Sequence, residues 1–136
     1  MAKQIFVNIP VKDLNVAIKF YTHLGFTFNQ QFTDENATCM IVSENIMVML
    51  LREEFFQKFT PKPISNAKES TEVLICISAE SRDEVDQYVR LAIEAGGKAL
   101  MPVQDHGFMY GHGFEDLDGH MWEISYMDMS ALPQNS

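Results

Sequence analysis

The sequence predicts an α+β fold of two βαβββ modules, which form a curved eight-stranded mixed sheet as half-barrels around a central cleft. Three observations predict this class. The order strand, helix, three strands occurs twice in 136 residues. A polar stretch with proline and serine separates the two occurrences. Each occurrence has one helix for four strands, so we expect each sheet to be covered on one face by its helix and on the other by the second sheet.

The boundaries follow from this order. We expect the first module at residues 1–60, a linker at residues 61–71 and the second module, with a short C-terminal tail, at residues 72–136. A chain of this length buries roughly two-thirds of its unfolded surface, so the two modules fit one domain overall.

The first module begins with a strand at residues 4–9, where polar and apolar residues alternate. A helix follows, with Asp13 as its N-cap and Gly25 as its left-handed stop. "REEFFQKF" predicts a short helix at the end of the module. The remaining strands are expected at residues 26–31, 37–43 and 46–51.

The second module repeats this pattern. "EVLICIS" predicts a strand that begins at Glu72, and Ser81 is placed to cap the helix "RDEVDQYVRLAIEA", which ends at Gly96. Further strands are expected at residues 98–103, 109–115 and 120–127.

The last two strands are joined by "DLDG", which suits a type I turn with Gly119 in the left-handed position. Asp116 is then expected to pair with His120. Counting outward, the predicted pairs are Phe114 with Trp122, Gly113 with Glu123, and Gly111 with Ser125.

Alternation along this hairpin assigns its faces. Trp122 and Ile124 are expected on the helix-covered face and Glu123 on the cleft face. Glycine weakens a strand interior, so Gly111 and Gly113 suggest space left for a ligand beside the carboxylate.

Two stretches resemble the vicinal oxygen chelate superfamily. "VNIPVKDLNVAIKFYTHLGF" resembles its opening strand and helix, and "FEDLDGHMWEIS" resembles its closing hairpin. The superfamily includes glyoxalase I, extradiol dioxygenases, fosfomycin-modifying enzymes and bleomycin-resistance binding proteins. The resemblance therefore implies the fold more firmly than the function.

In this superfamily four strands each supply one metal ligand, and Glu123 matches the last position. The other positions carry Phe6, Met49 and Glu72. Phenylalanine cannot coordinate, and a thioether is a poor ligand for hard or borderline ions. Glu123 and Glu72 would hold a divalent ion if one is bound, but these donors favour a chain with no cofactor.

We expect the cleft to bind a ligand through side chains from both modules. An alternative interpretation is that these side chains fill a closed core. The candidate ligand-binding residues are Phe6, Asn8, Met49, Glu72, Cys76, Tyr110, His112 and Met121.

Two of these candidates depend on local features. Tyr110 lies in "PVQDHGFMYGHG", which is either a mobile lid or an ordinary loop. His112 falls on the helix-covered face in the predicted register, and a β-bulge would be needed to rotate it into the cleft.

Charge and composition limit the partners. The formal net charge is −9 and the ten Lys and Arg residues do not cluster, which excludes nucleic acid as a probable partner. The cleft positions carry no Lys or Arg, so a neutral or cationic ligand fits better than an anion. Cys39 and Cys76 match no zinc spacing and are expected to be buried free thiols. The N-terminal residues lack a long apolar run, so we expect a cytoplasmic protein that does not bind membranes.

Two functions from different classes follow. The first is an enzyme that acts on a small organic compound, such as a metal-assisted lyase, with Glu123 as catalytic base or metal ligand. The alternative is a non-enzymatic binding protein of the resistance type with a degenerate metal site. In either case we expect a homodimer.

Overall fold

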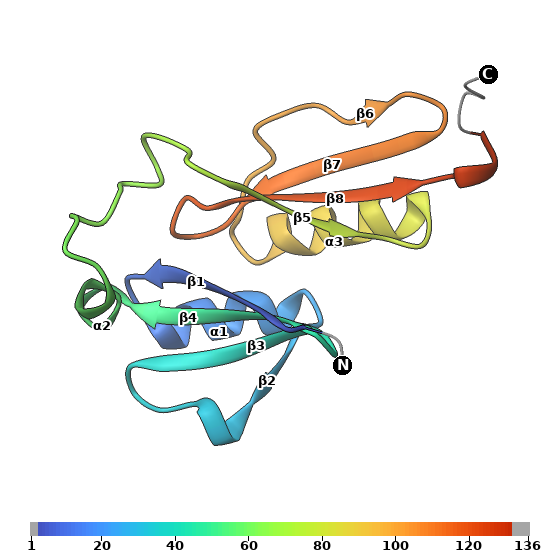
Figure 1. The fold of residues 1–136 in the computed structure, drawn as a ribbon. Helices are drawn as coiled ribbons and strands as arrows, with labels where there is room; N and C mark the ends of the chain where they lie inside the picture. Colours follow the sequence, from blue (N-terminus) through green and yellow to red (C-terminus); the bar gives the residue numbers. More distant parts are fainter. Residues whose placement is uncertain (1–2, 132–136) are drawn as a thin grey trace. The chain divides into compact units, whose positions relative to one another are not determined.

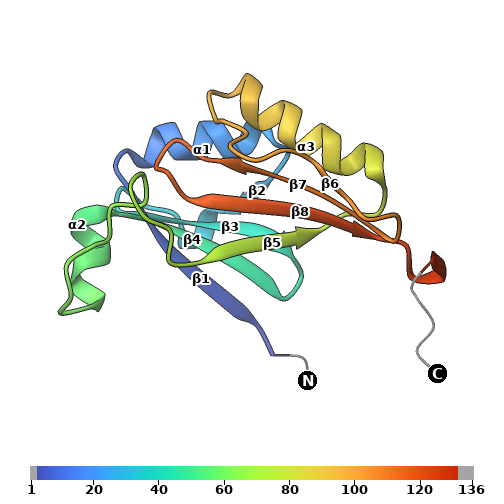
Figure 2. The same ribbon diagram turned by 90° about the horizontal axis from the view of Figure 1, so that it is seen from above.

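Figure 1 shows the fold in a computed structural model, which describes residues 3–131. The chain divides between Asn66 and Ala67 into two compact units, and this boundary falls inside the stretch predicted as a linker. Each unit contains one four-stranded mixed sheet with a helix along one of its faces (Figure 2). The predicted α+β class and the repeated βαβββ order are confirmed.

The first unit has strand order β1-β4-β3-β2. The outer strand β1 pairs with β4 in parallel, and the other neighbours are antiparallel. Its elements are β1 (Ile5–Val11), α1 (Leu14–His23), β2 (Thr27–Asn29), the 3₁₀ turn η1 (Gln30–Phe32), β3 (Ala37–Ser43), β4 (Ile46–Arg52), α2 (Glu53–Phe56) and η2 (Gln57–Phe59).

The second unit repeats this arrangement with order β5-β8-β7-β6, and β5 is parallel to β8. Its elements are β5 (Leu74–Ser78), α3 (Arg82–Glu94), β6 (Gln104–Asp105), β7 (Met109–Glu115), β8 (Met121–Met127) and η3 (Met129–Ala131). The 13 residues of α3 are fewer than the roughly 20 that a bilayer span needs. No helix within residues 3–131 is both long and apolar enough to cross a membrane.

Both main helices start and stop at the predicted residues. The side chain of Asp13 accepts a first-turn backbone N–H of α1, and Ser81 does the same for α3. Gly25 follows α1 with φ of 99°, and Gly96 follows α3 with φ of 105°. These left-handed positions favour glycine because a Cβ atom would be strained there.

Each unit has its core between its helix and one sheet face, which we call the helix-covered face. In the first unit, Phe20 and Tyr21 of α1 and Val48 and Leu50 of β4 are fully buried. The buried hydrophobic residues of the second unit are Val85, Val89, Ala92, Phe114, Trp122 and Ile124. The opposite face of each sheet, which its own helix does not cover, is called the helix-free face.

Several strand boundaries differ from the predictions. The strand predicted at residues 98–103 is absent from the described chain except for one bridge, between Lys98 and Glu115, and β6 forms later. Pro102 has no N–H to give to a ladder, which disfavours pairing there. β2 ends at Asn29 because its side chain accepts the N–H of Gln31 and starts η1. β5 begins at Leu74, so the predicted start at Glu72 is two residues early.

Candidate ligand-binding site

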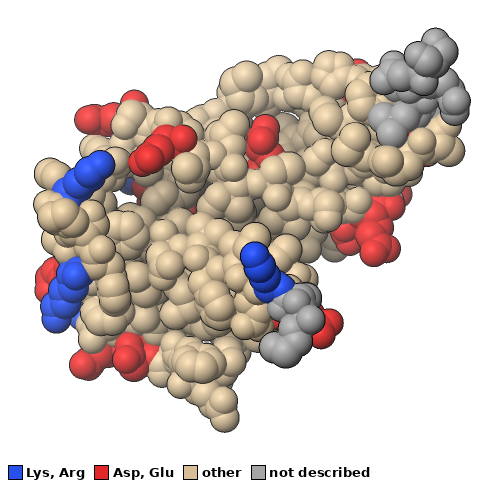
Figure 3. Space-filling model, viewed as in Figure 1, with Lys and Arg blue, Asp and Glu red and all other residues tan. Residues whose placement is uncertain are grey.

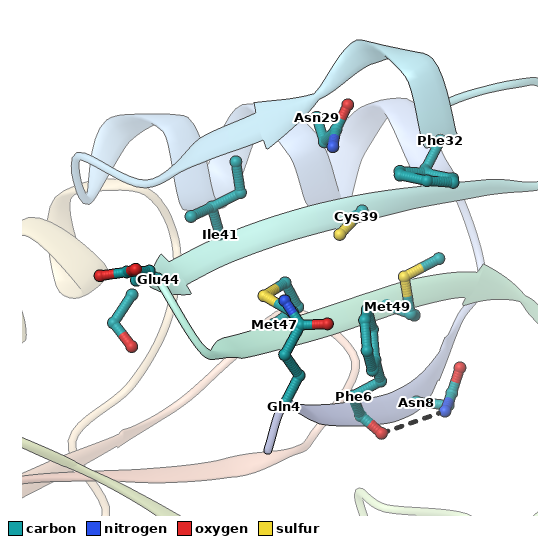
Figure 4. Close-up of a pocket in the computed structure, with 11 residues that line it drawn as sticks. Gln4, Phe6, Asn8, Asn29, Phe32, Cys39, Ile41, Glu44, Met47 and Met49 are labelled. Carbon is teal, nitrogen blue, oxygen red and sulfur yellow. Dashed lines mark hydrogen bonds between the residues drawn. The ribbon is translucent and has the colours of Figure 1, made fainter. Parts of the chain in front are cut away.

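A hollow of about 590 Å³ lies on the helix-free face of the first sheet (Figure 4), and we call it the first-sheet hollow. All four strands or the turns that follow them contribute to it. The lining residues are Gln4, Phe6, Asn8, Asn29, Phe32, Cys39, Ile41, Ser43, Glu44, Met47 and Met49.

The floor of the hollow comes from the two central strands. Cys39 and Ile41 of β3 lie opposite Met49 and Met47 of β4, and strand alternation places all four on the helix-free face. Cys39 and Met47 are buried. Thioether side chains have several rotatable bonds, so this floor can adapt its shape to a ligand.

Two aromatic side chains stand at opposite edges of the sheet. Phe6 comes from the outer strand β1 and is 51% exposed, and Phe32 follows the other outer strand, β2, and is 62% exposed. Both rings therefore have free apolar surface beside the hollow (Figure 4). Such rings gain stability by covering a ligand.

Polar groups lie around the rim. The side-chain amide of Asn8 donates weakly to the carbonyl oxygen of Phe6 at 3.4 Å. Among the described residues that line the hollow, Glu44 is the one charged side chain, and it lies in the turn between β3 and β4. The face viewed in Figure 3 likewise shows only separate Lys and Arg side chains among its described residues.

Three of the eight predicted ligand-binding residues, Phe6, Asn8 and Met49, line this hollow. Phe6 and Asn8 are two residues apart on β1 and therefore share one face of the strand. Cys76 and Met121 instead lie on the helix-free face of the second sheet. The expected cleft between the modules stays a prediction.

Glu123 lies in the second sheet at the predicted place. It is exposed on the helix-free face of β8, between Gly113 of β7 and Cys76 of β5. Cys76 is exposed rather than buried, which corrects the prediction for this thiol. Partial desolvation raises the pKa of Cys76, and the negative charge of Glu123 raises it further. The thiol therefore stays protonated at neutral pH and is a weak nucleophile.

The donors at the family's metal positions do not fit a divalent ion. Glu72 precedes β5 and is four residues from Cys76, the actual neighbour of Glu123, so up to about 13 Å of chain separates them. Phe6 and Met49 supply no hard donor. Within the described part of the chain, no three His, Cys, Asp or Glu side chains gather at one point.

Tyr110 and His112 lie on the helix-covered face of the second sheet, so the sheet separates them from Glu123 and one site cannot include all three. The hydroxyl of Tyr110 donates to Asp86 of α3 at 2.7 Å. Nε2 of His112 donates to the carbonyl oxygen of Met101 at 3.0 Å. These partners are structural, and no bulge turns His112 to the other face.

The loop that was interpreted either as a mobile lid or as an ordinary loop contacts α3 through Arg82. Both guanidinium nitrogens of Arg82 contact the carboxylate of Asp105, at 2.8 and 3.2 Å, and one also donates to the carbonyl oxygen of Gly107. Arg82 also lies 4.9 Å from the ring centre of Tyr110. This network holds residues 104–107 beside the helix.

The Arg82–Asp105 pair gives a pH-dependent prediction. Its hydrogen bond lowers the pKa of Asp105 below the ordinary value of 3.8, so the pair stabilises the fold above that pH and is lost as the pH falls through the folded-state pKa. Asp105→Asn should be less stable than wild type in urea unfolding at pH 7, and the difference should shrink as the pH falls below 3.8. A difference that stays constant with pH would contradict this assignment.

Gly113, which lies beside Glu123, has a packing role that the sequence did not predict. A Cβ atom on Gly113 would lie 2.5 Å from the carbonyl oxygen of Trp122, so the backbones approach too closely for a side chain. At Gly111 the nearest atom would be at an ordinary 3.6 Å. Packing of β7 on β8 therefore requires glycine at position 113 whether or not a ligand lies beside it, and space for a ligand there stays a prediction.

Asp116, which the sequence placed only as a turn residue, organises the hairpin. One of its oxygens accepts the backbone N–H groups of Asp118 and His120, both at 2.9 Å. The other accepts the indole N–H of Trp122 at 3.1 Å. Asp116 is 6% exposed and Trp122 is fully buried, so this carboxylate has a structural role.

Eight of the residues that line the hollow are not among the candidates named from the sequence: Gln4, Asn29, Phe32, Cys39, Ile41, Ser43, Glu44 and Met47. The signal for Cys39 was present, since the alternation of β3 and its pairing with β4 place it opposite Met49. The positions of Asn29 and Phe32 depend on the 3₁₀ turn after β2, and no periodicity of apolar residues predicts that turn.

The chain consists of two βαβββ units, and the first carries a hollow of ligand size. Sequence comparison names the class to which this fold belongs. The model of the Glyoxalase/Bleomycin resistance protein/Dioxygenase superfamily matches residues 3–124, so the chain belongs to this superfamily. Among curated proteins, none matches the sequence.

Solved structures share the fold. The hypothetical protein SA1046 from S. aureus is 28% identical, with a TM-score of 0.78 over 93% of this chain and 94% of that one. A glyoxalase-related enzyme from Fulvimarina pelagi is 16% identical, with a TM-score of 0.79 over 100% and 94%. The fosfomycin resistance protein FosX from Mesorhizobium loti is 13% identical, with a TM-score of 0.68 over 96% of both chains.

Proposed function

We propose that the protein binds a small, largely apolar organic molecule, neutral or cationic, in the first-sheet hollow. The observation that carries this proposal is a volume of about 590 Å³ with a floor of thioether, thiol and aliphatic side chains and a rim of amides. Sites for small molecules have typical volumes of 300–1,000 Å³, mostly apolar linings and a few polar groups that orient the ligand.

Charge supports the preference for a neutral or cationic ligand. Glu44 is the charged side chain among the described lining residues, and an anion there would lose hydration without gaining a cationic partner. The amides of Asn8 and Asn29 can donate to or accept from a neutral polar group. The hollow therefore selects ligands by shape and apolar contact, and the negative charge of Glu44 disfavours anions.

We treat binding without catalysis as the function that the site supports best. A catalytic role for Glu123 would need a partner that activates it, and the neighbour that the register gives it is the protonated thiol of Cys76. The homodimer and the cytoplasmic location stay predictions.

Three ring-matched probes test the proposal: quinoline, N-methylquinolinium and quinoline-4-carboxylate. We expect the first two to bind and to shift backbone amide NMR signals of β1, β3 and β4, with the carboxylate binding more weakly. Phe6→Leu should lower the affinity for quinoline and for N-methylquinolinium, because the aromatic surface of the phenylalanine is lost. Glu44→Gln should lower only the affinity for the cation N-methylquinolinium, by up to about fivefold, as expected for an exposed charge pair.

Glu123→Gln is the matched control, since it neutralises a carboxylate in the other unit. Its affinities should equal those of wild type. Signal shifts that gather on β5 and β8, together with a loss of affinity in Glu123→Gln, would place the site on the second sheet instead. If none of the three probes binds, the proposed function is wrong.

A further inference from the structure

We propose that the first-sheet hollow also binds one soft monovalent metal ion, of the Cu(I) and Ag(I) class, through the sulfur atoms of Cys39, Met47 and Met49. These three side chains share the floor of the hollow (Figure 4). They come from two neighbouring central strands, so the sheet itself fixes their spacing.

The register places the three sulfur-bearing side chains as neighbours on one face of the sheet. Cys39 and Met49 are directly opposite in the antiparallel pair β3–β4, where Cβ atoms are about 5 Å apart. Met47 is the next residue along β4 on the same face and is a diagonal neighbour of Cys39, at about 7–8 Å. A methionine side chain has three rotatable bonds and can span that distance.

The chemistry of these donors selects the ion. Thiolate and thioether ligands are soft and prefer Cu(I), whereas Mg²⁺, Ca²⁺ and Mn²⁺ prefer oxygen. When the metal binds, the S–H bond of Cys39 breaks, its proton leaves to solvent and an S–metal bond forms. The negative charge of the one thiolate then balances the single positive charge of the ion, and the two thioethers are neutral. A divalent ion would leave a net charge in an apolar hollow, which is costly.

Burial adds a pH dependence. It raises the pKa of the Cys39 thiol above its ordinary value of 9.0. The metal must therefore displace a proton at neutral pH, and its affinity should rise with pH until the free thiol ionises. The geometry and the donor set support the site independently of this effect.

The test uses the full chain in a Cys76→Ser background, which leaves Cys39 as the remaining thiol. We expect Ag(I) to bind one per chain, with a sulfur-to-metal charge-transfer band and only sulfur in the first shell by X-ray absorption. Cu(I), measured anaerobically against a chromogenic chelator, should behave alike, and Zn(II) should not compete.

Variants test whether the three sulfur atoms bind one ion together or only line the same hollow. Adding Cys39→Ser should weaken Ag(I) binding at least about 100-fold, and Met47→Leu or Met49→Leu should each weaken it about tenfold. Leucine keeps the floor apolar, so quinoline should still bind to both leucine variants. That separation distinguishes failure of the metal proposal from failure of the proposed function.

Unchanged Ag(I) affinity in the Met47→Leu/Met49→Leu double variant would overturn the proposal, because a thiol alone would then account for binding. Unchanged affinity after Cys39→Ser would overturn it as well. If Cys39→Ser does not fold, as judged by circular dichroism, the double leucine variant with Cys39 intact decides the question.

Discussion

Replacing Asp116 by alanine is expected to lower the free energy of unfolding by about 3–5 kcal/mol, measured by urea denaturation. The variant removes the carboxylate that accepts two backbone N–H groups and the indole N–H of Trp122. Trp122 is fully buried, so water cannot replace the lost partner. Because the indole belongs to the core of the second unit, the loss should extend beyond the turn.

Asp116→Asn is the matched control for this prediction. Its amide oxygen can still accept the two backbone N–H groups, but its NH₂ group would face the N–H of Trp122, donor against donor. We expect a loss of about 1–3 kcal/mol, between wild type and alanine. If alanine cost less than about 1 kcal/mol, the carboxylate would not be organising the hairpin.

Gly113→Ala is expected to lower the free energy of unfolding by about 2–4 kcal/mol, because its new methyl group would collide with the carbonyl oxygen of Trp122. A backbone atom cannot move aside as a flexible side chain can. Thermal unfolding followed by circular dichroism measures the change.

Gly111→Ala provides the control on the same strand and face. Its Cβ would meet only ordinary contacts, so its effect should stay within about 1 kcal/mol, in either direction. Equal effects of the two substitutions would show that β7 does not approach β8 more closely at Gly113 than at Gly111.

Much of the fold was predictable because its signals are local. The caps at Asp13 and Ser81 mark the helix starts, and "DLDG" with Gly119 fixes the register of the last hairpin. Gly119 has φ of 94°, as the turn requires. The prediction of a strand at residues 98–103 failed because the apolar residues there have no strand-pairing partner, and Pro102 has no backbone N–H to donate.

The candidate site was less predictable because it depends on neighbours distant in sequence. Phe6, Asn8 and Met49 were identified from alternation, which places each on a face. Glu123 was placed correctly on its strand, but its neighbour is Cys76 and not Glu72, since strand β5 starts later than its apolar pattern suggests. Spacing alone did not show that packing requires Gly113.

The parallel pairing of β1 has a consequence for how the hollow opens. β1 hydrogen-bonds to β4 alone among the strands of its sheet, and Ile5 pairs with Ile46, about forty residues away. Closing a loop of that length costs about 3 kcal/mol of chain entropy, whereas β2, β3 and β4 are joined by short turns. The strand that carries Phe6 and Asn8 is therefore held by one neighbouring strand, and its detachment regains the entropy of that long loop. A ligand that binds Phe6 and Asn8 therefore stabilises this edge of the sheet against local unfolding.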